Sequence, residues 1–154
     1  MTKIKQLILT ITFTIIFIIC WSFNNAQTQE VICGPRAYML ENMELRFGEK
    51  EIERGIDTQT GMMLLITANT FGNWSLLLTP ASNPKNLCVP LTGTKWKQAY
   101  NLSSGTAFDG STFTIQFTDE GDFKMYWLDK NTKTLTLMIK GYDWTRFWEF
   151  DKTL

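Results

Sequence analysis

The chain has 154 residues, of which 15 are basic and 15 acidic, so its formal net charge is zero. This balance lacks the excess of positive charge that a general nucleic-acid binder carries, and we expect no nucleic-acid partner. The sequence contains no histidine, which excludes Ser-His-Asp and Cys-His mechanisms for this chain. No Gly-rich phosphate loop joins a strand to a helix, so no cofactor is expected.

Residues 1–26 have the layout of a secretory signal peptide. Lys3 and Lys5 precede an apolar run at residues 7–21, and polar residues then lead to Ala26. We expect cleavage after Ala26, which leaves a single domain of residues 27–154 in the periplasm or outside the cell. That domain keeps 13 basic and all 15 acidic residues, a net charge of minus two. The alternative is a retained membrane anchor, although the run is short for a span of about 20 residues.

The mature chain keeps two cysteines, Cys33 and Cys88, because Cys20 lies in the signal segment. An even pair in an exported protein predicts a disulfide. Such a bond would stabilise the fold by roughly 4 kcal/mol in the chain-entropy model. Two buried free thiols are the alternative. A metal site is not expected, because two cysteines without histidine form a poor ligand set.

Residues 35–47 predict the one helix of the domain. Pro35 suits a first helical turn and Gly48 supplies a stop. Apolar residues recur between them at helical spacing: Met39, Leu40, Met43 and Phe47. We expect this face to pack on a sheet that contains residues 62–66.

From residue 50 onward, short β segments alternate with turn residues. The first predicted strands are residues 51–56, 62–68, 74–79 and 87–91, and the second series is residues 112–118, 123–128, 134–140 and 144–150. Residues 100–110, rich in Ser, Gly and Asn, are expected to link the two series as a loop. The predicted fold class is mainly β with one N-terminal α-helix, built from antiparallel meander sheets and closed by one disulfide.

Two features near the C-terminus are candidate sites. Asp119, Glu120 and Asp122 are clustered enough to suggest the paired carboxylates of a glycosidase, but acidic residues beside a glycine are also typical of a hairpin turn. The other feature is a predicted surface on the C-terminal strands, with these members: Tyr126, Met138, Arg146 and Phe147. Exposed apolar area of this kind would suit a protein, peptide or saccharide partner.

Three short motifs stand out in the first half of the domain: Cys33-Gly34-Pro35-Arg36, Gly72-Asn73-Trp74-Ser75 and Cys88-Val89. With these motifs the chain resembles a family of small exported alphaproteobacterial proteins of unknown function. The resemblance covers residues 33–96, about half of the mature chain, and it implies export and a Cys33–Cys88 bridge but no activity. It divides the domain into a family-like part, residues 33–98, and a C-terminal β extension, residues 99–154.

The sequence favours a non-enzymatic exported domain that binds a partner through its β surface, or a structural module. One rival hypothesis is a small carbohydrate-active enzyme that uses the acidic turn at residues 119–122. Another is a protein anchored by an uncleaved N-terminal segment.

Overall fold

The computed structural model describes residues 30–147, so the predicted signal segment, residues 1–26, lies outside the described residues. All elements belong to the compact unit that begins at Val31. They are β1 (Ile32–Pro35), α2 (Arg36–Phe47), β2 (Lys50–Asp57), β3 (Met63–Ala68), β4 (Trp74–Leu78), β5 (Asn86–Ala99), β6 (Leu102–Ala107), β7 (Thr112–Phe117), β8 (Phe123–Leu128) and β9 (Leu135–Arg146).

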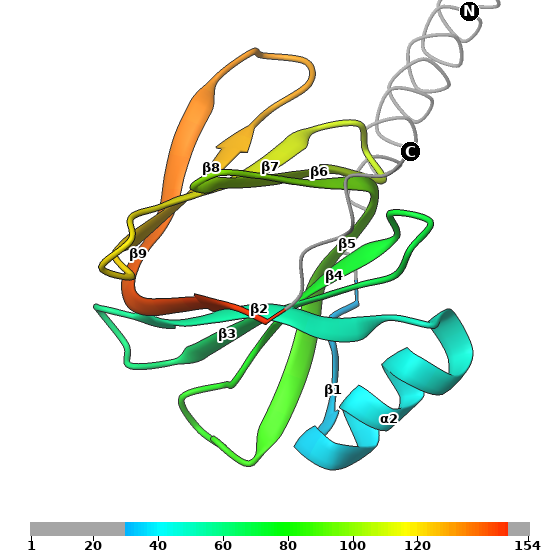
Figure 1. The fold of residues 1–154 in the computed structure, drawn as a ribbon. Helices are drawn as coiled ribbons and strands as arrows, with labels where there is room; N and C mark the ends of the chain where they lie inside the picture. Colours follow the sequence, from blue (N-terminus) through cyan, green and yellow to red (C-terminus); the bar gives the residue numbers. More distant parts are fainter. Residues whose placement is uncertain (1–29, 148–154) are drawn as a thin grey trace, which may run out of the picture. The chain divides into compact units, whose positions relative to one another are not determined.

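Strands β2 to β9 form a closed antiparallel barrel of eight strands (Figure 1). Each strand pairs with the next in the sequence, and β9 pairs with β2 to complete the ring. Closure leaves no free edge among these strands. The short β1 adds to β5 beside the ring, with Ile32 opposite Val89. The predicted fold class is confirmed, and the meander is one barrel in which residues 33–98 and 99–147 complete the same sheet.

Two predicted boundaries are wrong. The expected linking loop at residues 100–110 contains strand β6, and the two strands expected at residues 134–140 and 144–150 are one strand, β9, as far as residue 146. In β6 the small residue Gly105 faces the indole of Trp74, and a Cβ on Gly105 would collide with that ring. Glycine at position 105 therefore leaves room for the ring of Trp74. In β9, Asp143 has a positive φ of 55°, and the strand continues through this irregularity.

The barrel interior is filled with aromatic and aliphatic side chains from alternate positions of the strands. The ring of Trp74 stacks on Phe113 with centroids 5.4 Å apart, and Phe123 contacts Trp144 at 4.7 Å. The buried members are Ile52, Leu64, Ile66, Ala68, Trp74, Leu76, Trp96, Phe113, Ile115, Phe123, Met125 and Trp144. This is the main hydrophobic core.

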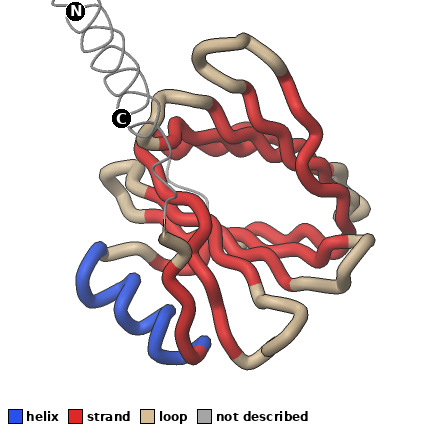
Figure 2. Tube along the Cα trace, turned by 180° about the vertical axis from the view of Figure 1, so that it is seen from behind, coloured by secondary structure: helices blue, strands red, loops and turns tan. Residues whose placement is uncertain are grey.

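Helix α2 lies against the outside of the barrel, beside β1 (Figure 2). Its Met39 and Met43 form a second core with Leu65, Leu77 and Leu87 of the barrel wall. Strand β3 is therefore apolar on both faces because Leu64 and Ile66 point inward while Leu65 points toward the helix.

The predicted helix face is confirmed for Met39 and Met43, with Leu40 packed at its side. It is wrong for Phe47, which is 58 % exposed. Phe47 is the last helical residue before Gly48, whose left-handed conformation (φ 65°) turns the chain toward β2. Its ring therefore leaves the packed face.

The predicted disulfide between Cys33 and Cys88 is confirmed, with sulfur atoms 2.00 Å apart. The two residues face each other in the β1–β5 pairing. The bond fixes the start of α2 to the barrel, because the helix begins at Arg36.

Candidate functional site

A groove of about 700 Å³ lies between helix α2 and the outer face of β4 and β5. The helix supplies one wall, and Ser75, Val89 and Thr92 of the strands contribute to the other side. Its volume lies within the range of about 300–1,000 Å³ that is typical of small-molecule sites. Apolar and polar side chains both line it: Ile32, Tyr38, Met39, Asn42, Met43, Arg46, Phe47, Glu49, Asn69, Phe71, Asn73, Trp74, Ser75, Val89, Thr92, Gly93 and Phe108.

Exposed aromatic side chains form part of this lining. Phe71, in the turn between β3 and β4, is 89 % exposed, and Phe108, Tyr38 and Phe47 are also exposed. They come from three separate parts of the chain. Because large apolar side chains gathered at one place on a surface usually mark a binding site, the groove is the strongest candidate among the described residues.

Asn69 fixes the turn that carries Phe71. Its side-chain oxygen accepts hydrogen bonds from the backbone N–H groups of Phe71 (3.0 Å) and Asn73 (3.1 Å). Its side-chain nitrogen donates to the carbonyl of Phe47 at 2.8 Å. One buried amide thus joins the end of α2 to the β3–β4 turn, and the groove is held in shape from both sides.

Glu49 is the buried acidic group of the groove. It follows Gly48, and its backbone N–H donates to the carbonyl of Met43 at 3.1 Å, which completes the helix cap. This local turn directs the side chain beneath the helix, where the residue is 6 % exposed. The hydroxyl of Thr67 donates to Glu49 Oε2 at 2.8 Å, and Ser75 also hydrogen-bonds to the carboxyl group.

The environment of Glu49 changes its acidity. Burial raises the pKa of the carboxyl group above its ordinary value, while the hydrogen bonds from Thr67 and Ser75 act in the opposite direction. Among residues 30–147, the ion pairs join Lys50 to Glu44, Arg54 to Glu51 and Arg146 to Glu53, and none of them involves Glu49. Its carboxylate is therefore buried with hydroxyl partners and no cation of the described chain.

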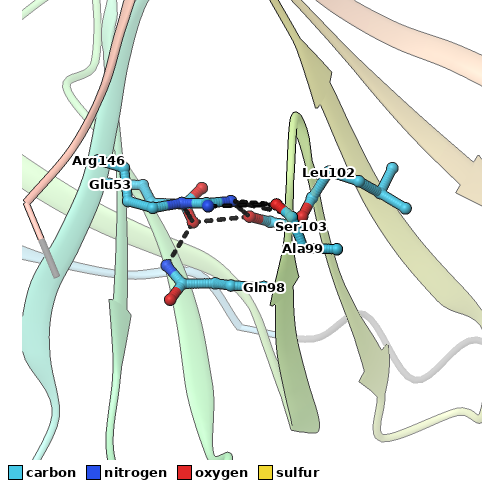
Figure 3. Close-up of polar contacts among 6 residues, drawn as sticks. All are labelled: Glu53, Gln98, Ala99, Leu102, Ser103 and Arg146. Carbon is cyan, nitrogen blue, oxygen red and sulfur yellow. Dashed lines mark hydrogen bonds and ion pairs between the residues drawn. The ribbon is translucent and has the colours of Figure 1, made fainter. Parts of the chain in front are cut away.

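A second buried carboxylate, Glu53, lies inside the barrel and is 0 % exposed (Figure 3). Its Oε1 accepts hydrogen bonds from Ser103 Oγ (2.6 Å), Gln98 Nε2 (2.7 Å) and Arg146 Nε (3.2 Å). These partners come from strands β6, β5 and β9. The cluster therefore ties the barrel together across the position where β9 meets β2.

Arg146 was predicted to flank a binding surface, but its side chain is only 14 % exposed and turns into the barrel. Its guanidinium donates to the carbonyl oxygens of Ala99 and Leu102 and lies 4.8 Å from the ring centre of Phe117. All these contacts belong to the barrel. Arg146 is thus mostly buried among residues of the barrel, and a role for it in binding stays a prediction.

The other predicted surface residues do not form one patch. Tyr126 is half-buried, and Met138 is exposed beside its strand neighbour Leu137. Phe147 is exposed just beyond the far end of β9, with the guanidinium of Arg54 at 4.6 Å from its ring centre. The structure brings Tyr126 and Met138 near each other and separates Phe147 from them. A role for these residues in binding stays a prediction.

The acidic segment at residues 119–122 forms the turn between β7 and β8. Backbone hydrogen bonds join Thr118 N to Asp122 O at 2.9 Å and Gly121 N to Thr118 O at 3.1 Å. Asp119 accepts hydrogen bonds from the exposed hydroxyl of Tyr100, and this contact raises the pKa of that tyrosine. None of these residues lines the groove. A catalytic role for the acidic turn stays a prediction.

The sequence pattern does not predict the groove. Phe71 lies beside Gly72 and Asn73, which are typical turn residues, and no motif assigns a role to Glu49. The available signal was an aromatic residue at a turn tip, which is an unusual place for a large apolar side chain. The position of Glu49 directly after a helix stop gave no hint of burial, because that burial depends on where α2 packs.

Comparisons with protein-family models, curated proteins and solved structures yield no match for this chain. Within residues 30–147, no helix has the length and apolar character needed to cross a bilayer. In the same part of the chain, no three potential metal-ligating side chains are gathered in one place.

Proposed function

We propose that the protein is an exported binding domain that holds a small ligand with an apolar body in the groove beneath helix α2. The observation that carries this proposal is the groove itself, which combines a volume suited to a small molecule with exposed aromatic side chains. Export is supported by the layout of residues 1–26 and by the disulfide, since such bonds persist in oxidising compartments.

The groove has the support that a preformed site requires. The Cys33–Cys88 bond holds the start of α2, the contacts of Met39 and Met43 with Leu65 hold its middle, and Asn69 binds the carbonyl at its end. Because the helix is attached along its whole length, little ordering is needed when a ligand enters. This lowers the entropic cost of binding.

A small ligand is favoured over a flat saccharide or protein contact because the lining comes from both sides of a concave space. The exposed rings of Phe71 and Phe108 would cover an apolar body that enters between the helix and the strands. Burial of apolar surface contributes roughly 25 cal/mol per Å², so these rings would supply much of the affinity.

The test uses neutral apolar probes, from 4-phenylbutanol to Nile red, followed by NMR chemical-shift changes and calorimetry. We expect saturable binding with shifts confined to α2, β4, β5 and the β3–β4 turn. Replacing Phe71 by Ser should weaken binding by about five- to tenfold, which corresponds to roughly 1 kcal/mol of lost apolar burial.

The matched control is Leu135→Ser, which removes another exposed apolar side chain from the opposite part of the sequence. It should leave binding unchanged. The proposal is overturned if none of the probes binds saturably, or if the shifts map to β8 and β9. The second outcome would favour the surface that contains Tyr126 and Met138.

A further inference from the structure

We infer that the ligand of this groove carries a positively charged amine, which pairs with the Glu49 carboxylate while the apolar body lies between the helix and the strands. The inference rests on the proposed function, because it assigns the ligand class for the same site. Three observations support it: the missing counter-ion of Glu49, the charges around it and the aromatic lining.

The first observation is a buried carboxylate that has no cation. Carboxylates are almost never fully buried unless they are paired, because removal of a charge from water carries a large penalty. Glu49 is 6 % exposed, lines the groove and receives hydrogen bonds only from neutral hydroxyls. A ligand cation that enters the groove would reach the one partner that this carboxylate lacks in the described residues.

The second observation concerns the neighbouring charges. Strands β3 and β4, which supply Thr67 and Ser75, contain no ionisable side chain. On the adjoining segments, Lys50 is paired with Glu44 at 3.3 Å and Arg54 with Glu51 at 3.7 Å, and neither forms an ion pair with Glu49 among the described residues.

Among residues 30–147, Arg46 is the one basic residue that lines the groove, but its side chain lies in the exposed last turn of α2. No hydrogen bond or ion pair joins it to Glu49 among the described contacts. The position next to Glu49 is thus open to a cation from outside. The negative end of the helix dipole lies at the same place, because Glu49 directly follows the C-terminal cap of α2.

The third observation is the kind of exposed side chain that lines the groove. Tyr38, Phe47 and Phe71 present aromatic rings, whose faces attract ammonium groups as well as apolar surface. A carboxylate in a groove that aromatic rings also line is complementary to an amine on an apolar body. It is not complementary to a carboxylate ligand, which Glu49 would repel.

The test compares three probes with the same phenylbutyl body and different head groups: 4-phenylbutylamine, 4-phenylbutanol and 4-phenylbutyrate. At neutral pH we expect the amine to bind the wild-type protein about tenfold more tightly than the alcohol, since a charge-assisted hydrogen bond contributes about 1.4 kcal/mol or more. The carboxylate probe should bind most weakly. Dissociation constants come from calorimetry or NMR titration.

The deciding variant is Glu49→Gln, which keeps the shape of the side chain and removes its charge. It should reduce the affinity for the amine to that for the alcohol while the alcohol binds as before. The matched control is Glu44→Gln, an exposed acidic residue of the same helix that is paired with Lys50; it should leave all three affinities unchanged. An NMR spectrum of the Glu49→Gln variant checks that the fold is intact.

A second measurement needs no variant. The preference of the wild-type protein for the amine should disappear as the pH falls through the pKa of Glu49, because the carboxyl group then becomes neutral. Equal binding of amine and alcohol at neutral pH, or tighter binding of the carboxylate probe, would overturn the inference and leave the proposed function standing. Failure of all three probes to bind would overturn both.

Discussion

Two buried glutamates lie four residues apart in the sequence and on opposite sides of the barrel wall. Glu53 points into the barrel, where Arg146, Gln98 and Ser103 satisfy its Oε1. Glu49 lies outside the barrel beneath helix α2, where hydroxyl groups of Thr67 and Ser75 are its partners. The two residues share a chemical type and a low exposure, and they differ in whether residues 30–147 provide a cation.

This difference separates the structural contacts of Glu53 from the binding role that we propose for Glu49. Glu53 and its partners connect strands that are distant in the sequence, so its charge is compensated by the fold itself. Glu49 has no such compensation, and burial therefore disfavours its ionised form. A buried charge that only a ligand compensates makes the empty protein less stable, and such a loss of stability is common at functional positions.

Removing the cation of Glu53 should have the largest effect. Arg146→Met leaves the carboxylate buried without an ion-pair partner, and loss of one member of a buried pair costs about 3–5 kcal/mol. Urea denaturation measures the change in the free energy of unfolding. Lys140→Met, at an exposed position of the same strand, is the control and should change stability by about 0.5 kcal/mol or less.

A loss below about 1 kcal/mol in Arg146→Met would contradict the structural role of this pair. Adding Glu53→Gln to Arg146→Met sharpens the result. The double variant should recover part of the lost stability, because it also removes the uncompensated charge.

Removal of the disulfide should have the next largest effect. It acts on helix α2 and therefore on the groove that contains Glu49. Replacing both Cys33 and Cys88 by Ser should lower the free energy of unfolding by about 2–4 kcal/mol. It should also weaken probe binding in the groove, because the bond holds the start of α2. Denaturation of oxidised and reduced wild-type protein also measures the contribution of the bond. Identical midpoints would show that the disulfide does not stabilise the fold.

A smaller effect is expected from Glu49 on the pH dependence of the free energy of unfolding. Burial raises its pKa in the folded state, so the folded protein binds this proton more tightly than the unfolded chain does. Wild-type stability should therefore fall, relative to Glu49→Gln, as the pH rises from the ordinary glutamate value near 4.5 through the raised pKa. Above that pH the difference should stay constant.

The measurement is a series of urea midpoints for both proteins between acidic and neutral pH. A rise of wild-type stability relative to the variant over this interval would show that the carboxylate is better stabilised in the fold than burial implies. Addition of a bound amine should reduce the fall, because a nearby cation favours the ionised carboxylate.

The smallest effect is expected at the exposed acidic turn. Asp119→Asn should lower the raised pKa of Tyr100 toward its usual value, because Asp119 is the main cause of that shift. Spectrophotometric titration of the tyrosines measures the change, with Asp122→Asn as the control. Groove binding should be unaffected by either variant. A glycosidase activity that disappears in both variants would instead establish the enzyme hypothesis.

The sequence by itself determined the local features. Alternating apolar residues fixed the inward and outward faces of strands such as β7 and β8, because side chains of a strand alternate across the sheet. Pro35 and Gly48 located the helix, and the even cysteine pair predicted the bond between Cys33 and Cys88. These features depend on neighbouring residues or on chemistry that composition reveals.

The tertiary structure alone decided how these pieces combine. A period of two shows which face of a strand is apolar but not which strand lies beside it, so the pairing of β9 with β2 was not predictable. The contact between Arg146 and Glu53 spans 93 residues, and local sequence does not show that this arginine pairs with a buried carboxylate inside the barrel. In the same way, Glu49 became a groove residue only because α2 packs over β3 and β4 and excludes water from a charged side chain that local sequence would leave exposed.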